Sequence, residues 1–386
     1  MKLMHISDLH IGKRVNEFSM IEDQTYILEQ IVEIAIDEKI EGILIAGDIY
    51  DKSQPSSEAV LLLDHFVTSL TALHIPIFVI SGNHDSAERL SFGSKLLHKN
   101  KLFITSMFQG TLDSFELTDV HGPIHIYMLP FLKPAMLRPF FDDPIDTYDE
   151  AIRKVIQTAS IDTSKRNILL AHQFIISESK QPERSDSESI SVGGLDQIDA
   201  SAFKDFDYVA LGHLHGPQKI GRDTIRYSGS PLKYSFSEVN QKKSVVIIDI
   251  KGKGDIDISL APLIPKHDLR KIKGPMKELL ALGKADTKEH SDYIYATLTN
   301  EEELYDAIGQ LRVVYPNIMG LDYENSKTQT AVTTCTDGSN DISALSIRNP
   351  LKLFSEFYQM QNNIELAKEQ EELMKDIFEQ SGENSL

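Results

Sequence analysis

Cysteine is almost absent from this chain of 386 residues, since Cys335 stands alone. A single cysteine excludes an internal disulfide and a metal cluster held by several thiolates. Apolar runs such as ILIAG and IPIFVI fall far short of the roughly 18 to 20 residues that span a bilayer. The start MKLMHISDLH also lacks the charged-then-apolar layout of a signal peptide. We therefore expect a cytoplasmic protein.

Positive charge is also scarce, because 39 Lys and Arg stand against 58 Asp and Glu, which gives a formal net charge of −19. Proteins that hold DNA by its phosphates usually carry an excess of Lys and Arg, so this balance argues against a stand-alone DNA binder. Bound cations would neutralise several carboxylates, and a partner subunit could supply positive surface. The charge thus weakens a nucleic-acid function without excluding it.

The first half of the chain alternates short apolar runs with helical patterns, and 41% of all residues are hydrophobic. This alternation is typical of an α/β domain whose helices pack on the faces of a sheet. We expect helices at about 19–37 and 57–73, and the hairpin-like later strands predict mixed sheets. The predicted strands lie at 3–6, 42–46, 75–80, 124–129, 166–171, 207–211, 224–227 and 244–250.

The pattern changes after about residue 261, where strands alternate with helices in a way that indicates a small separate α+β domain. Near the C-terminus, Phe354, Phe357 and Tyr358 fall at helical i, i+3 and i+4 spacing, which predicts an amphipathic helix. That helix either packs on its own chain or lies against a partner helix. The expected divisions are an α/β domain at 1–260, the small domain at 261–325, a polar linker at 326–349 and a helical tail at 350–386.

A serine-rich segment of mixed charge runs from Ser177 to Ser191 and contains almost nothing apolar. Such a composition predicts a mobile surface loop. The loop is either an inert excursion or a lid that contacts substrate beside the neighbouring motifs. Its composition favours the inert interpretation.

Polar motifs follow the predicted strands, at the positions where α/β folds build their sites. Residues two apart in an extended chain point the same way, so we expect Asp8 and His10 to reach one metal. Asp48 follows a buried strand, where an unpaired charge would be costly without a cation. Each motif alone is weak, but the set of oxygen and nitrogen donors indicates a metal centre. The motifs are Asp8-Leu9-His10, Gly47-Asp48, Gly82-Asn83-His84-Asp85, Ala171-His172 and Gly212-His213-Leu214-His215.

Together these motifs give D-x-H, G-D, G-N-H-D, H and G-H-x-H, which resembles the complete pattern of the calcineurin-like metallophosphoesterase family over about residues 1–260. The resemblance implies an α/β (α+β) fold, a four-layer sandwich of two mixed β-sheets flanked by helices. It also implies two metal ions, and donors without thiolate favour Mn²⁺, with Fe or Zn²⁺ as alternatives. The implied ligands are Asp8, His10 and His215 for one metal, Asn83, His172 and His213 for the other, and Asp48 as the bridge.

His84 belongs to the same pattern but is not assigned to a metal. The resemblance implies that it stabilises the charge that develops on the phosphoryl group or protonates the leaving oxygen. Asp85 is expected to orient His84, as carboxylates beside working imidazoles commonly do.

Longer strings are similar to the SbcD family, the nuclease subunits of bacterial SbcC–SbcD complexes. They are MKLMHISDLHIGK, GDIYDKSQPSSEAV, GNHDSAERLSFGS, GHLH and the tail string NPLKLFSEFY. The resemblance implies Mn-dependent double-strand exonuclease and single-strand or hairpin endonuclease activity in DNA repair, recombination and replication. It further implies a capping domain that positions DNA, a homodimer through the nuclease domain, and a heterotetramer of two SbcD with two SbcC, whose coiled-coil base binds the tail and which uses ATP.

Contacts with DNA and SbcC are less closely defined by the sequence. The candidate phosphate contacts are Lys13, Arg14 and Arg89, and each is equally well interpreted as a solvated surface cation. Two other functions remain open, a metallophosphoesterase acting on small nucleotides or phosphoproteins and a non-catalytic DNA-end adaptor. The long extension after residue 260 disfavours the first, and the complete ligand set disfavours the second. The candidate SbcC contacts are Leu353, Phe354, Phe357 and Tyr358.

Overall fold

The structure is a computed structural model that divides the chain into two compact units, residues 1–323 and 324–386. Among the described residues, no helix combines the length and apolarity that a bilayer crossing requires. The expected linker at 326–349, and Leu353 and Phe357 of the tail, lie outside the described residues. Described are 1–142, 144–177, 182–188, 196–285, 291–302 and 304–324, with Phe354, Ser355, Tyr358, Ala367, Lys368, Gln370, Glu371, Leu373 and Met374.

The first of two large sheets has six strands in the order β16-β15-β1-β4-β5-β6. The four strands from β1 to β6 in this order are parallel, and β15 and β16 run antiparallel to their neighbours. The strands are β1 (Lys2–Ile6), β4 (Gly42–Ala46), β5 (Ile77–Ile80), β6 (Leu102–Thr105), β15 (Ser244–Ile250) and β16 (Ile256–Pro262).

The second large sheet also has six strands, in the order β13-β14-β12-β9-β8-β7. Its four inner strands are parallel, and an antiparallel strand closes each edge. The strands are β7 (Asp113–Asp119), β8 (Gly122–Leu129), β9 (Arg166–His172), β12 (Tyr208–Gly212), β13 (Gln218–Ile220) and β14 (Arg222–Tyr227).

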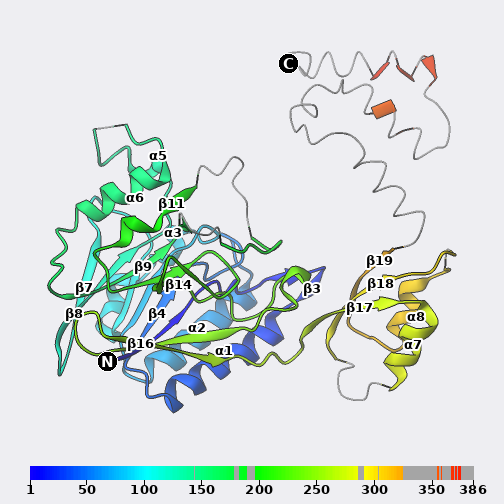
Figure 1. The fold of residues 1–386 in the computed structure, drawn as a ribbon, viewed down its shortest axis with the longest axis horizontal. Helices are drawn as coiled ribbons and strands as arrows, with labels where there is room; N and C mark the ends of the chain where they lie inside the picture. Colours follow the sequence, from blue (N-terminus) through cyan, green and yellow to red (C-terminus); the bar gives the residue numbers. More distant parts are fainter. Residues whose placement is uncertain are drawn as a thin grey trace. The chain divides into compact units, whose positions relative to one another are not determined.

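Helices cover the outer faces of both sheets (Figure 1). The helices α1 (Ile21–Asp37) and α2 (Ser57–Thr71) pack on the first sheet, and α6 (Tyr148–Gln157) packs on the second. Apolar side chains such as Phe78 and Ile168 fill the layer between the sheets. The expected four-layer sandwich of two mixed sheets is therefore confirmed.

Local sequence explains where these helices begin. The Ser56 hydroxyl accepts a hydrogen bond from the Ala59 N–H at the start of α2. A capping box between Thr147 and Glu150 opens α6. The shorter elements are β2 (Arg14–Val15), β3 (Phe18–Ser19), α3 (Ala87–Leu90), α4 (Ser94–Leu97), α5 (Pro134–Leu137), β10 (Phe174–Ile176), β11 (Gln197–Asp199) and 3₁₀ turns at His98–Asn100, Ala200–Phe203 and Phe236–Glu238.

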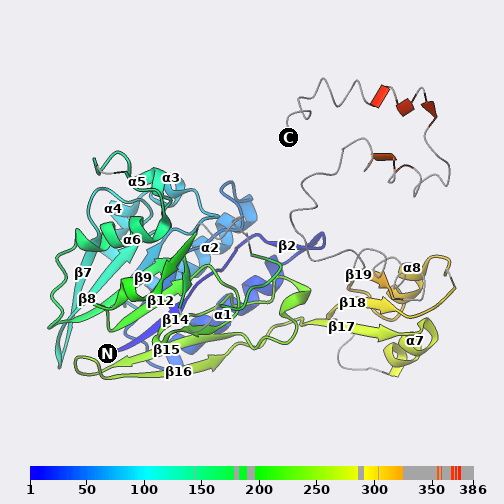
Figure 2. The same ribbon diagram turned by 45° about the horizontal axis from the view of Figure 1, so that its top comes forward.

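A small α+β domain follows β16 in the chain, and Figure 2 shows its strands β17, β18 and β19 with the helices α7 and α8 beside them. Its strands are all parallel and its core is its own, built on Leu279, Ile294 and Leu311. The Tyr293 hydroxyl donates to Asp23 of α1 over 2.7 Å. The elements are β17 (Leu269–Gly274), α7 (Met276–Ala285), β18 (Tyr293–Leu298), α8 (Ala307–Arg312) and β19 (Ile318–Tyr323).

Candidate metal centre

All five motifs lie at the carboxyl ends of parallel strands, three in the first sheet and two in the second. The loops after β1, β4 and β5 carry the N-terminal motifs, while the end of β9 and the loop after β12 carry the three later histidines. Because these strand ends meet where the two sheets face each other, residues more than 200 positions apart come into contact, as in His10 and His215.

The backbone is strained at this point. Four non-glycine residues that the sequence nominates as ligands adopt positive φ: 53° at Asp8, 44° at His10, 50° at Asp48 and 110° at His213. Such conformations are uncommon and collect at functional sites, where the surrounding structure must hold them. Here the N–H of Asp8 donates to the Gly47 carbonyl and that of His10 to the Asp48 carbonyl, each over 3.0 Å. The extended-chain argument for Asp8 and His10 is therefore wrong, although the side chains do converge.

Two glycines let the loops approach closely. A Cβ on Gly82 would lie 2.1 Å from the Asp48 carboxylate, and one on Gly212 would lie 2.0 Å from the Ala46 carbonyl. Any side chain at either position would push the strand ends apart.

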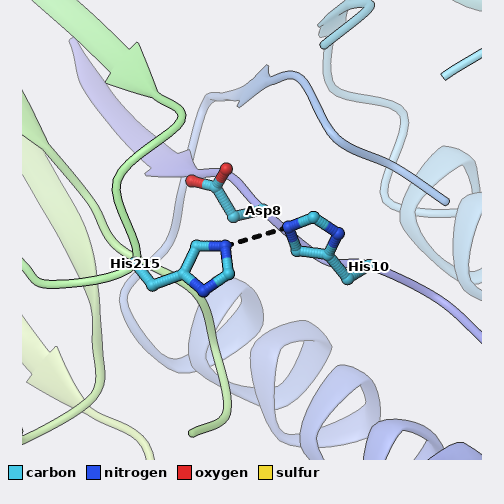
Figure 3. A group of neighbouring side chains, drawn as sticks. All are labelled: Asp8, His10 and His215. Carbon is cyan, nitrogen blue, oxygen red and sulfur yellow. Dashed lines mark hydrogen bonds between the residues drawn. The ribbon is translucent and has the colours of Figure 1, made fainter. Parts of the chain in front are cut away.

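Asp8, His10 and His215 form one group of potential ligands, whose donor atoms all lie within 4.8 Å of one another. The Nε2 atoms of His10 and His215 face each other over 3.0 Å (Figure 3). All three side chains are buried, and the Nδ1 of His10 has no hydrogen-bond partner among the described residues. Opposed imidazole nitrogens beside a buried carboxylate are an arrangement that a cation stabilises.

Asn83, His172 and His213 lie together next to this group. The Asn83 Oδ1 lies 3.1 Å from Nε2 of His172 and 2.9 Å from Nδ1 of His213. The Nδ1 of His172 is bonded to the Ala46 carbonyl over 2.7 Å, which turns Nε2 toward the centre. Asp48 lies between the two groups of side chains, since its Oδ2 is 3.3 Å from Nε2 of His172 and 3.6 Å from Nε2 of His10.

The electrostatics of the centre suit a divalent cation. Burial raises the pKa of Asp8. Burial acts on Asp48 in the same direction, but His172, His10 and His84 together outweigh it and hold the pKa of Asp48 well below its usual range. Burial lowers the pKa of His172, but Asp48, with Asp8 and the Ala46 carbonyl, more than reverses this and raises that pKa to about 9. Burial also lowers the pKa of His10, and it lowers that of His213 to about 3, which favours the neutral imidazole that binds metals.

A buried polar network braces His215 from outside the centre. Its Nδ1 lies 2.7 Å from the Ser187 hydroxyl, and its backbone N–H donates to Glu188 over 2.8 Å. Ser187 in turn donates to the fully buried Glu238 over 2.6 Å. Lys243 Nζ donates to Glu238 over 2.6 Å and to the His215 carbonyl over 2.8 Å. We call Ser187, Glu188, Glu238 and Lys243 the His215 brace.

The brace corrects one interpretation of the serine-rich segment. Residues 182–188 are described, and they bond to His215, Glu238 and Gln218, so this part of the segment belongs to the site and is not an inert excursion. Glu238 and Lys243 carry no signal in the sequence, because they stand in a polar stretch without any motif or periodicity.

His84 and Asp85 lie beside Asp48, but they do not act on each other as expected. The Nδ1 of His84 lies 2.8 Å from the carbonyl oxygen of Asp51, and its backbone N–H donates to Asp48 over 2.8 Å. The Asp85 carboxylate instead accepts the backbone N–H groups of Ile49, Tyr50 and Gly82. Asp85 therefore holds the loops together, and the backbone carbonyl of Asp51 orients His84.

The cations nominated for DNA differ from one another in their surroundings. Lys13 is half-buried and paired with Asp51 over 2.8 Å. Arg14 is exposed and donates to the Glu17 carbonyl, and Arg89 is exposed on α3. Arg14 and Arg89 thus remain more accessible to a ligand than Lys13.

Sequence comparisons assign this arrangement to a family. Two family models match the chain, calcineurin-like phosphoesterase over residues 1–217 and the type 5 capsule protein repressor C-terminal domain over residues 265–362. The chain is also 38% identical over 326 residues to the SbcD subunit of the SbcCD nuclease of Staphylococcus epidermidis, a match covering 83% of this chain and 85% of that protein. The chain belongs to the SbcD family of calcineurin-like phosphoesterases. The chain is therefore a metal-dependent phosphodiesterase, that is, a nuclease. The buried carboxylates and imidazoles described above form its site for divalent metal ions.

Solved structures give more distant matches. A crystal structure of a Thermus thermophilus protein matches with a TM-score of 0.35 and 13% identity, covering 67% of this chain and 98% of that one. A dimetal phosphatase from Danio rerio matches with a TM-score of 0.38 and 11% identity, covering 68% and 99%. Membership in the SbcD family rests on the sequence matches.

Proposed function

We propose that this chain is a Mn²⁺-dependent nuclease that cuts DNA ends and hairpins together with an SbcC ATPase. The observation that carries the proposal is the convergence of buried carboxylates and imidazoles on Asp48, whose Oδ2 lies 3.6 Å from His10 and 3.3 Å from His172. The kinship with the SbcD family supports the choice of DNA as substrate. Repair, recombination and replication are the processes in which such ends and hairpins arise.

We assign the ligands in two groups that share Asp48. Asp8, His10 and His215 would hold one cation, and Asn83, His172 and His213 the other. The donor atoms of Asp8, His10 and His215 lie within 4.8 Å of one another, and so do those of Asp8, Asp48 and His172, which supports a place for Asp48 between the two groups. The Asn83 Oδ1 lies 3.1 Å from His172 and 2.9 Å from His213. Carboxylate, amide and imidazole donors suit Mn²⁺, with Fe or Zn²⁺ as alternatives. Divalent cations, when bound as a pair, neutralise phosphate charge and lower the pKa of a bound water so that hydroxide is available at neutral pH.

His84 is the residue of this chain that we propose to act on the reacting phosphate. Since its Nδ1 faces the Asp51 carbonyl over 2.8 Å, an N–H at Nδ1 would donate to that carbonyl, and Nε2 is left to meet the substrate. In the imidazolium form, Nε2 also carries a proton, which would stabilise the phosphoryl oxygens or pass to the leaving oxygen and return the ring to its neutral form. Asp85 supports this role indirectly, because it bonds the loop that carries His84 to the loop after β4.

Exposed cationic side chains near the centre would contact the phosphates of the DNA. A cavity of about 330 Å³ beside Asp51 is lined in part by Arg14 and Lys52. Arg89 follows His84 by five positions on the chain and is exposed. We propose Arg14 and Arg89 as phosphate contacts, Lys13 as a weaker one because Asp51 pairs with it, and the small domain at 261–325 as the element that positions DNA.

The C-terminal tail would bind SbcC. The rings of Phe354 and Tyr358 lie one helical turn apart with centroids 6.3 Å from each other, which supports an apolar stripe along a helix. Leu353 and Phe357 complete the proposed contact set, and linker 326–349 would connect it to the rest of the chain. We propose a heterotetramer of two such chains and two SbcC subunits, with the chains paired through their nuclease domains and ATP hydrolysed by SbcC.

A direct comparison of substrates tests the proposal. The purified chain is given Mn²⁺ and offered linear duplex DNA, a DNA hairpin and bis(p-nitrophenyl) phosphate, with and without SbcC and ATP. We expect both DNA substrates and the aryl diester to be cleaved. Aryl turnover without any DNA cleavage, even with SbcC and ATP present, would overturn the nuclease function.

A truncated chain tests whether the tail binds SbcC independently of the catalytic activity of the metal centre. A chain ending at Asn349 should keep its Mn²⁺-dependent aryl turnover and lose SbcC in a pull-down, while the full chain retains both. Capture of SbcC by the truncated chain would show that the tail is not the contact.

A further inference from the structure

A cavity of about 280 Å³ lies against the open side of the metal centre. Asn83 and His213 form part of its wall, so a group inside the cavity lies next to whatever the centre binds. The other lining residues have no part in the proposed chemistry. They are Phe131, Lys133, Tyr148, Gln173, Phe174 and Asp196, and we call this cavity the base pocket.

Aromatic rings flank His213 at the mouth of the base pocket. The Phe131 ring lies 6.5 Å from the His213 ring at an interplanar angle of 23°, and the Phe174 ring lies 6.3 Å away at 74°. Phe131 is half-buried, so part of its ring remains accessible. The Lys133 ammonium lies 6.0 Å from the centre of that ring, which keeps a positive charge at the rim. Flat aromatic surface beside a cation suits a planar group attached to a phosphate.

The base pocket also carries an unsatisfied polar group. Asp196 is 9% exposed, and its Oδ1 has no hydrogen-bond partner among the residues described. A buried acceptor without a donor costs free energy, so its presence on a cavity wall indicates a ligand that brings an N–H or O–H group. A carboxylate repels phosphate, and therefore the donor belongs to a neutral part of the ligand.

We propose that the base pocket receives the nucleobase of the nucleotide next to the scissile phosphate. This inference rests on the proposed nuclease function. A nucleobase has a flat face to stack on Phe131 and edge N–H groups to donate to Asp196, while its own phosphate reaches the centre past Asn83 and His213. Stacking tolerates every base, so the pocket would require that a base is present without selecting one sequence.

The wild-type chain tests the inference with DNA that lacks one base. Two oligonucleotide duplexes of the same sequence are compared in Mn²⁺, one intact and one with a tetrahydrofuran abasic residue at one position, and each cleavage site is mapped. We expect one of the two bonds that flank the abasic residue to be cut about tenfold to a hundredfold more slowly, the range that a lost base–aromatic stack gives. Cleavage of both bonds at the rate of the intact duplex overturns the inference, whereas failure to cut either duplex counts against the nuclease function instead.

Variants then locate the effect in the base pocket. In Phe131→Leu and Asp196→Asn, the ratio of intact to abasic cleavage should fall toward one. Phe115→Leu, on the edge strand β7, and Asp223→Asn, on the surface hairpin β13–β14, are matched controls that should keep the wild-type ratio. Metal content and the unfolding temperature of each variant are measured alongside. A wild-type ratio in both pocket variants would place the base elsewhere.

Discussion

The two sides of the metal centre are built differently. On one side, His10 and His215 are buried, and the His215 brace surrounds His215 with Ser187, Glu188 and the Glu238–Lys243 pair. On the other side, Asn83 and His213 are half-buried and form a wall of the base pocket. We infer that the buried side holds a cation in place, while the half-buried side remains accessible to the substrate.

Asp48 joins the two sides, so its loss should have the largest effect. Asp48→Ala removes the carboxylate that faces both His10 and His172 and the acceptor for the His84 N–H. We expect metal content to fall on both sides and turnover to drop on the order of 10³-fold or more, because the several kcal/mol that a metal pair contributes is lost. Elemental analysis and cleavage assays measure this, with Asp223→Ala as a surface control. Full metal content in Asp48→Ala would show that Asp48 is not shared.

His84, whose ring lies 4.8 Å from that of His10, tests whether the chemical step can be lost while metal binding is kept. His84→Ala should lower turnover by about 10²- to 10⁴-fold, as for other general acids, and leave the metal content nearly unchanged. Single-turnover kinetics and elemental analysis on the same sample check both parts. Loss of metal would show instead that His84 is a ligand.

Substitution of Lys243 tests whether the His215 brace supports metal binding. Lys243→Met leaves the buried Glu238 carboxylate without its cationic partner, 2.6 Å away in the native protein. His215 should then be held less well, and the affinity for the metal on that side should fall about 10- to 100-fold. A Mn²⁺ titration of binding and activity measures the shift, and the paired variant Glu238→Gln/Lys243→Met should recover part of it because no unpaired charge remains. Unchanged affinity in Lys243→Met would mean that the brace serves the fold alone.

A pair remote from the centre should change stability and leave the chemistry nearly intact. Hydrogen bonds from Arg166 hold the pKa of Asp119 well below its usual range, over distances of 2.6 and 3.1 Å. A carboxylate with a depressed pKa stabilises the fold above its unfolded pKa, and that stability is lost as the pH falls through its folded pKa. Asp119→Asn should therefore lower the free energy of unfolding by about 2–3 kcal/mol at pH 7, and the difference should shrink below about pH 4.

Denaturant unfolding at several pH values measures this, and aryl turnover in Mn²⁺ measures the chemistry. A loss of stability that stays constant down to about pH 3, below the unfolded pKa of an aspartate, would show that the ion pair is not its source.

Sequence periodicity predicts the central strands well and the edges poorly. The buried runs at β1, β4, β5, β9 and β12 are continuous and apolar, so their positions follow from composition. The strands β6, β7 and β16 lie at sheet edges; exposed positions interrupt the apolar pattern of β7 and β16, and β6 is only four residues long with two half-buried positions. Pairing with a neighbour far along the chain defines these strands, which local pattern does not reveal.

The same limit applies to the site. The polar motifs are readable because they follow strands that the sequence predicts, and the structure brings them together. The contact that orients His84 comes from a backbone carbonyl. Every residue has such a carbonyl, so the sequence cannot indicate this contact. The brace depends on Glu238 and Lys243, whose burial arises only when distant segments pack together. Sequence therefore indicates the donors, and tertiary structure decides what supports them.

The central claim is that two cations share Asp48, one on each side of the centre. Anomalous diffraction from a crystal grown with Mn²⁺ tests it most directly. We expect two manganese peaks that both contact Asp48, one also contacting Asp8, His10 and His215 and the other also contacting Asn83, His172 and His213. A single peak at saturating Mn²⁺, or a peak coordinated by His84, would contradict it.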